Sequence, residues 1–238
     1  MTPNKLITRS NQRMHTKIDW LDSRHSFSFG DHYDPERMGY GALRVVNDDH
    51  VAPGRGFAPH PHSNMEIISI VLEGQLAHKD NLGNERIIET GEIQYMSAGS
   101  GIVHSEFNPS NEKPVHFMQI WIEPNAKGLE PRYADQPIIG AIDNQWQLIL
   151  SPNGKAGSMA IRQDVELHTA KINEGTSLAY TPRTSNHGLW LFVIEGTVET
   201  DGEKLFKGDS LAISGIDALS LKAISTSDAK VMLFELQL

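Results

Sequence analysis

Short apolar runs recur along the whole chain, separated by turns rich in Gly, Pro, Asn and Asp. Runs of four to eight residues between such turns are typical of β-strands. Few stretches keep a 3.6-residue apolar period over ten or more positions, so we expect no long helices. The pattern therefore predicts an all-β fold of the sandwich or barrel type. We expect strands at residues 43–47, 67–73, 86–89, 92–97, 115–122, 146–150, 189–194, 205–206, 211–213 and 231–236.

The order of these runs repeats about half a chain apart. A run that ends in Glu73-Gly74 is echoed by a run that ends in Glu195-Gly196, and a hairpin turn and a further strand follow each of them. Such a repeat indicates two similar β-barrel units. Residues 124–145 lack the strand pattern and contain several Pro and Gly residues, as expected of a connection. We place the boundary near residue 135 and expect domains at 1–135 and 136–238.

Composition narrows the chemistry. The 238 residues, 39% of them hydrophobic, are enough to bury cores without covalent cross-links. The absence of Cys excludes disulfides and thiolate chemistry, so a metal ion would need imidazole and carboxylate ligands. The net charge of −9 argues against direct nucleic-acid binding. No apolar run approaches the ~18 residues of a membrane span, so we expect no membrane association and a cytoplasmic location.

Histidine is unevenly distributed, with nine of the 11 histidines before residue 120. His60 and His62 lie two residues apart, as do His104 and Glu106, so each pair shares one face of an extended strand. One such pair alone is more often a pair of ordinary surface or core residues. Two pairs in the register expected of neighbouring strands favour a metal site. The chain contains no Gly-x-Ser-x-Gly, His-Glu-x-x-His or Gly-x-x-x-x-Gly-Lys-Ser/Thr motif, which sets aside the enzymes built on them.

Two motifs around these pairs resemble those of the cupin superfamily. The first motif is matched by Gly54, His60, His62, Glu66 and Gly74, and the second by Gly91, Gly99, His104 and Asn108. Ser97 replaces the usual Pro of the second motif, and four residues instead of two precede its His. These departures, together with the stretches 20–23, 25–29, 43–48 and 101–106, resemble the pirin family of two-barrel cupins. The resemblance is strongest to bacterial pirin-like proteins described as quercetin 2,3-dioxygenases.

The resemblance implies two tandem cupin (jelly-roll) barrels with one divalent transition-metal ion in the first. Its ligands would be His60, His62, His104 and Glu106, while Glu66 would not bind the ion. Such nitrogen and oxygen ligands suit Fe, Ni, Zn, Mn, Co or Cu, of which iron is our first choice, followed by nickel and zinc. In the second barrel Pro182 and Thr184 stand where the histidine pair would be, so we expect no metal site of this kind there.

By the same resemblance, the protein is expected to be a dioxygenase that opens the heterocycle of a flavonol such as quercetin with O2 and releases carbon monoxide. Glu106 would then be both a ligand and the catalytic base, although a carboxylate that only neutralises charge is an equal alternative. A second reading is a metal- or redox-dependent regulatory protein that binds a protein partner. A third is a small-molecule binding module without turnover. The ligand set is common to all three.

Other residues near the motifs have two interpretations. Phe57 either lines a pocket for an aromatic molecule or packs in the core, and the core is the simpler assignment. His116 either orients a metal ligand or is a structural histidine. His25, His32, His50 and His78 lie in or near polar turn sequence, and we expect them to be solvated.

Overall fold

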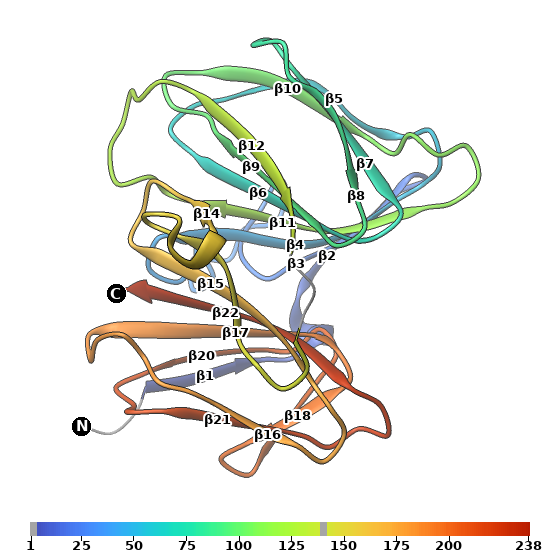
Figure 1. Ribbon diagram of the computed structural model, residues 1–238. Helices are drawn as coiled ribbons and strands as arrows, with labels where there is room; N and C mark the ends of the chain where they lie inside the picture. Colours follow the sequence, from blue (N-terminus) through green and yellow to red (C-terminus); the bar gives the residue numbers. More distant parts are fainter. Residues whose placement is uncertain (1–3, 139–141) are drawn as a thin grey trace. The chain divides into compact units, whose positions relative to one another are not determined.

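The computed structural model describes residues 4–138 and 142–238. Their regular structure is almost entirely β (Figure 1), which confirms the all-β prediction. All ten expected strands are present, most of them longer by one to four residues than expected. Two short 3₁₀ turns, Ser10–Gln12 and Lys155–Gly157, are the only helical elements in these two ranges. Within them, no helix has the length and apolar character needed to cross a membrane.

The chain forms two compact units, which we call the histidine-rich unit (Met14–Ile138) and the terminal unit (Met1–Arg13 with Ile139–Leu238). This division differs from the expected one of 1–135 and 136–238 mainly at the N-terminus. There, strand β1 (Asn4–Thr8) pairs with strand β20 (Ser210–Ser214) of the terminal unit. The first strand of the sequence therefore completes a sheet that is otherwise built from the second half of the chain.

The histidine-rich unit consists of a seven-stranded sheet in the order β12-β9-β6-β11-β4-β3-β2 and a four-stranded sheet in the order β5-β10-β7-β8 (Figure 1). Its strands are β2 (Met14–Lys17), β3 (Leu21–His25), β4 (Leu43–Val51), β5 (Gly56–His62), β6 (Glu66–Glu73), β7 (Gln75–Asp80), β8 (Glu85–Glu89), β9 (Glu92–Ser97), β10 (Ile102–Phe107), β11 (Val115–Ile122) and β12 (Arg132–Pro137).

Burial in the histidine-rich unit follows the apolar pattern. Strand β6 lies between β9 and β11, and its first six residues are buried, which explains its continuous apolar run. Strand β10 alternates strictly: Ile102, His104 and Glu106 are buried, and the residues between them are more exposed. Because this period is that of an extended strand, the two polar side chains are directed inward together with the apolar one.

The terminal unit repeats the arrangement, with sheets β1-β20-β17-β22-β15-β13-β14 and β16-β21-β18-β19. Its own core of Leu, Ile, Val and Ala side chains is fully buried. Besides β1 and β20, its strands are β13 (Gln147–Ser151), β14 (Met159–Ala160), β15 (Val165–Ile172), β16 (Ser177–Tyr180), β17 (His187–Glu195), β18 (Thr197–Thr200), β19 (Glu203–Phe206), β21 (Leu219–Ala223) and β22 (Ala229–Gln237).

The repeated Glu-Gly pairs have the same structural role in both units. Gly74 and Gly196 both have positive φ, 81° and 76°, where side-chain-bearing residues are strained. A Cβ on Gly74 would lie 2.9 Å from the Pro114 carbonyl oxygen, and one on Gly196 would lie 2.9 Å from the Ala229 Cα. Each glycine therefore allows the chain to turn closely against a neighbouring strand of its own unit.

The expected connection at residues 124–145 is only partly irregular. It contains β12, which pairs with β9 from Arg132↔Ser97 to Pro137↔Glu92. The position expected for the domain boundary, residue 135, thus lies inside a strand of the histidine-rich unit. A strand at the edge of a sheet needs little apolar character, because only one of its neighbours is a strand.

Candidate metal centre

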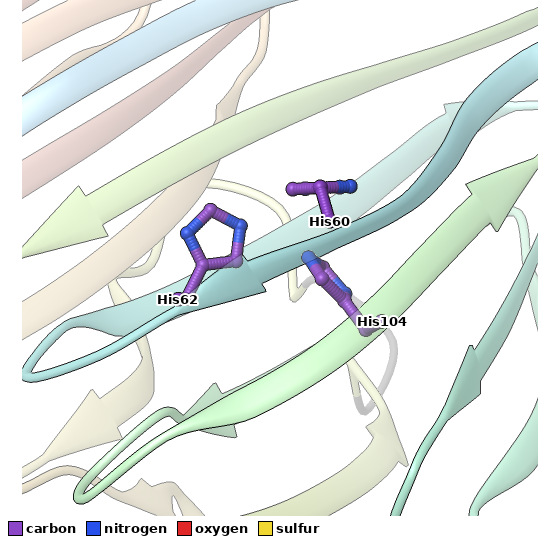
Figure 2. Close-up of side chains that lie close together, drawn as sticks. All are labelled: His60, His62 and His104. Carbon is purple, nitrogen blue, oxygen red and sulfur yellow. The ribbon is translucent and has the colours of Figure 1, made fainter.

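Three histidine side chains meet on two paired strands of the histidine-rich unit (Figure 2). His60 and His62 lie on β5, and His104 lies on β10 directly opposite His60. The ring centroids are 4.6 Å apart for His60 and His104, 4.7 Å for His60 and His62, and 5.0 Å for His62 and His104. One nitrogen of each ring lies within 4.8 Å of the others. The structure therefore brings together the three histidines that the two motifs had singled out.

Strand β5 can carry this arrangement because it is an edge strand. It pairs with β10 on one side only. Pro59 and Pro61, which have no N–H to donate, are tolerated at such an edge. Both prolines are exposed, whereas the His60 and His62 side chains lie on the other side of the strand. The alternation of Pro and His thus separates a solvent face from a ligand face.

Hydrogen bonds leave one nitrogen of His60 and one of His104 available to a cation. The His60 Nδ1 lies 2.8 Å from the Ala58 carbonyl oxygen and donates to it, so Nε2 carries the lone pair. The His104 Nδ1 lies 3.5 Å from the His78 Nδ1. The Nε2 atoms of His62 and His104 are buried and have no hydrogen-bond partner within residues 4–138 and 142–238. Such buried unpaired nitrogens are costly unless a ligand binds them, and a metal ion fits this donor set.

Burial keeps two of these imidazoles neutral. Burial, with a smaller effect from the neighbouring histidines, lowers the pKa of His62 to about 4 and that of His104 to about 3. A neutral imidazole is the form that binds a metal ion. Both rings are therefore in their metal-binding form at neutral pH.

His78 and Asp80, neither of which the sequence analysis placed in the site, orient His104 from behind. The His78 Nε2 lies 3.0 Å from the Asp80 Oδ2, and both side chains are fully buried. If His78 donates from Nε2, its Nδ1 accepts from the His104 Nδ1–H, which leaves the His104 Nε2 as the free acceptor. Carboxylate–histidine pairs behind a metal ligand commonly set its tautomer in this way. The prediction that His78 is solvated is wrong. The burial of His78 could have been predicted from the alternation of Leu76, His78 and Asp80, which places all three residues on the inner face of β7.

Glu106 is buried on β10, two residues after His104. A register shift between His104 and Glu106 places Glu106 opposite Phe57 instead of Ala58. Its carboxylate accepts hydrogen bonds from the Ser69 hydroxyl at 3.0 Å and from the Gln94 and Gln119 amides at 3.1 and 3.2 Å. An oxygen of Glu106 also groups with His78 and His104 within 4.8 Å. Glu106 is not in the group of three histidines at this spacing, so its role as the fourth ligand stays a prediction.

The remaining acidic and histidine side chains of the motifs have other partners. Glu66 accepts hydrogen bonds from the Tyr95 hydroxyl and, at 2.7 Å, from the Ser97 hydroxyl. It belongs to none of the three groups of potential metal ligands among the described residues. The His116 Nε2 lies 2.6 Å from the Asp48 Oδ1, and its ring stacks on that of His50. The partners of His116 are therefore Asp48 and His50, and His116 does not orient any of the three histidines.

A cavity of about 490 Å³ opens beside the centre, within the histidine-rich unit. His60, Glu106 and Gln119 line it near the centre. Phe57 lines it as well and packs edge-on against Trp20 at 5.2 Å, so it has both of the roles considered for it. The volume of the cavity lies within the range of small-molecule binding sites. His25 also lines it and is only 2% exposed, so the expectation that this histidine is solvated is wrong.

Comparisons with known proteins agree with this geometry. Residues 7–122 match the family model described as Pirin, and residues 148–236 match the one described as Quercetinase C-terminal cupin domain. The chain is 43% identical over 231 residues to the quercetin 2,3-dioxygenase of Escherichia coli strain K12, covering 97% of each chain.

Two solved structures show the same fold. The crystal structure of YhhW from Escherichia coli has a TM-score of 0.93 at 41% identity and covers 98% of this chain and 97% of its own. The bacterial pirin YhhW in complex with nickel(II), also from Escherichia coli, has a TM-score of 0.93 at 40% identity and covers 98% of this chain and 99% of its own. These similarities confirm the predicted pair of tandem cupin barrels.

Proposed function

Because this chain belongs to the pirin family of two-domain cupins, we propose that it is a metal-dependent dioxygenase that opens the heterocycle of a flavonol such as quercetin with O2. The observation that carries the proposal is the set of three imidazoles, two of them with buried unpaired nitrogens, of which the third, His60, lines a cavity large enough for an aromatic substrate. A relative that matches 97% of the chain has the name quercetin 2,3-dioxygenase.

The cofactor that we propose is one divalent transition-metal ion, held by His60, His62, His104 and Glu106. One solved relative, the bacterial pirin YhhW, is in complex with nickel(II). Nickel and iron both suit nitrogen and oxygen ligands, so the ligand set is compatible with either. Four protein ligands would leave room in a six-coordinate ion for substrate atoms. When bound, such an ion acts as a Lewis acid that makes a coordinated hydroxyl more acidic.

Glu106 is the residue of this chain that we assign to the proton of the flavonol 3-hydroxyl. It lines the cavity, and one of its oxygens groups with the donor nitrogens of His78 and His104. The three hydrogen bonds that it accepts hold it in one orientation toward the reacting ring. A general base held at hydrogen-bond distance from its proton typically contributes ~10²–10⁴-fold in rate.

The apolar side chains of the cavity exclude water and orient the rings of the substrate. They come from Ile18, Leu21, Phe29, Phe57 and Trp121. Trp121 packs edge-on against His62 at 4.8 Å and against Phe29 at 5.4 Å, so the aromatic wall continues directly from the ligand cluster. A planar substrate on this wall would present one edge to His60 and Glu106, which line the same cavity.

Oxygen uptake by protein of known metal content tests the function. We expect one tightly bound transition-metal ion per chain and uptake of O2 that requires both a flavonol and the metal and stops on chelation. A His60→Ala/His104→Ala double variant should retain neither metal nor activity. Full retention of metal by that variant would refute the ligand assignment. Absence of uptake with every metal tested would refute the dioxygenase. The regulatory reading with a protein partner, and the cytoplasmic location, stay predictions.

A further inference from the structure

The cavity has two chemically different sides. One is the apolar wall of Ile18, Leu21, Phe29, Phe57 and Trp121. The other is polar and crosses neighbouring strands of one sheet, because Gln119 on β11 faces Asn47 on β4, and Asn47 faces His25 on β3. All three polar residues line the cavity. Neighbouring strands are about 4.8 Å apart, so the polar side extends about 10 Å from Gln119 to His25. Gln119 also donates a hydrogen bond to Glu106.

A hydrogen-bonded chain holds the polar side in one orientation. The His25 Nδ1 lies 2.9 Å from the Asn47 Oδ1, and its Nε2 lies 2.9 Å from the Thr16 hydroxyl. The same hydroxyl lies 3.1 Å from the His32 Nε2. If His32 donates to Thr16 and Thr16 donates to His25, then His25 donates from Nδ1 to the oxygen of Asn47. Each group in this chain then has a defined donor and acceptor.

Asn47 is left with two N–H donors for the cavity. Its oxygen is engaged by His25, and its amide nitrogen has no acceptor in the part of the chain that the structure describes. The side chain is only 2% exposed. Because Asn47 lines the cavity, these N–H groups can donate to an oxygen of a molecule bound there. The carboxylate of Asp49, two residues further on the same face of β4, lines the cavity next to it.

We propose that Asn47, positioned by His25 and Thr16, is a specificity-determining residue that donates a hydrogen bond to a phenolic oxygen of the substrate. The substrate class is a planar aromatic molecule with oxygen atoms along one edge and an apolar face. Quercetin has this pattern at its 3, 4 and 5 positions, and it carries two further hydroxyls on its pendant ring. The inference rests on the proposed function and adds the residue that selects among flavonols.

Three flavonols that differ in their hydroxyl groups identify the substrate oxygen that Asn47 contacts. Fisetin differs from quercetin only in lacking the 5-hydroxyl, and galangin only in lacking the two hydroxyls of the pendant ring. We expect the metal-loaded wild-type protein to prefer quercetin about tenfold in kcat/KM over one of the two analogues, as one hydrogen bond of this kind allows. Asn47→Leu should bring that ratio close to one. Asn47→Asp keeps the acceptor for His25 but replaces the donor by an acceptor, so it should lower the ratio as well.

Asn144→Asp is the matched control. The Asn144 Oδ1 accepts from the Asn173 N–H at 2.8 Å, and the residue belongs to the terminal unit, so the substitution makes the same change of charge outside the cavity. It should leave both ratios unchanged. Melting temperatures of all variants show which of them fold. Should Asn47→Leu fail to fold, Asn47→Asp and the wild-type preference decide the question.

Measuring flavonol binding without O2 tests this inference independently of the proposed function. Dissociation constants of the three flavonols, measured by absorption without O2, should show the same preference and its loss in the Asn47 variants. If the wild type binds with this preference but never consumes O2, the proposed function is wrong and the inference stands. If quercetin, fisetin and galangin are turned over equally well, or if the preference survives both Asn47 variants, the inference is overturned and the dioxygenase stands.

Discussion

At the scale of single residues, the centre depends on donor atoms that are kept unprotonated and aimed at one point. Burial lowers the pKa of His62 and of His104, and the hydrogen bond from the His60 Nδ1 to the Ala58 carbonyl oxygen directs the His60 Nε2 away from the backbone. Glu106 differs, because three donors surround its carboxylate. These donors hold the carboxylate in one orientation beside the histidines.

Glu106→Gln tests the role of that carboxylate. The amide keeps an oxygen that can coordinate weakly but cannot accept the substrate proton, so we expect flavonol binding to persist while turnover falls ~10²–10⁴-fold. Anaerobic flavonol titration and oxygen uptake on the same metal-loaded samples measure the two quantities. Unchanged turnover would leave the enzyme assignment in place and move the deprotonation to another group.

His168 in the terminal unit predicts a pH dependence of stability. Burial lowers its pKa to about 4, below the value of about 6.5 in an unfolded chain. The unfolded state therefore binds a proton that the folded state does not bind. The contribution of His168 to the free energy of unfolding is fully present above pH ~6.5. It is lost at about 1.4 kcal/mol per pH unit as the pH falls toward 4.

Urea unfolding of the metal-free protein at several pH values measures this loss. His168→Gln should have a free energy of unfolding that falls less steeply below pH ~6.5, by about that amount per unit. Above this pH the difference between the two proteins should be constant. Equal slopes in the variant and the wild type would contradict the assignment.

At the scale of elements, the period of a strand places the ligands. His60 and His62 share a face only because one residue separates them on β5. The step from His104 to Glu106 shows that register is local, because the pairing with β5 shifts there while β7 continues in register on the other side of β10. A bulge of this kind changes the direction of a side chain without ending a sheet.

An insertion tests this dependence. One Ala placed between Pro61 and His62 would put the two histidines on opposite faces of β5. We expect the metal content to fall from one ion per chain to nearly none, while the β-type circular dichroism is kept. One Ala after Asn111, in an exposed loop between β10 and β11, is the control and should keep the metal. Full metal content in the Pro61 insertion would show that the ligands come from elsewhere.

At the scale of the whole molecule, each unit has its own pair of sheets and its own buried core. The metal centre and the cavity lie within the histidine-rich unit alone. Metal binding is therefore added to a fold that apolar burial already stabilises, unlike in small domains that fold only around their metal.

Removing the metal should consequently lower the melting temperature without unfolding the chain. Binding to the native state alone contributes about 2.7–4.1 kcal/mol when the free metal is at 100–1,000 times its dissociation constant. Calorimetry and circular dichroism before and after chelation measure the two effects. The spectrum of an unfolded chain after chelation would show that the centre is structural.

The local pattern of the sequence was sufficient for the all-β class, for the ten strands with the strongest apolar runs and for the cluster of His60, His62 and His104, whereas the role of Glu106 as a ligand stays a prediction. The physical reason is that strand periodicity and apolar content are properties of neighbouring residues. Strands such as β2 and β12 were missed, because sheet edges need little apolar character. The resemblance of the motifs added the family and the function.

Only the tertiary structure decided which distant residues support these pairs. Alternation along β7 directs His78 and Asp80 inward, but only strand register places them behind His104 and places Asn47 beside His25 on the neighbouring strand. The same holds for β1, which begins the sequence but pairs with β20 at the edge of the terminal unit. Strand pairing joins segments that are far apart in the chain, and its partners follow from how a whole unit buries its core.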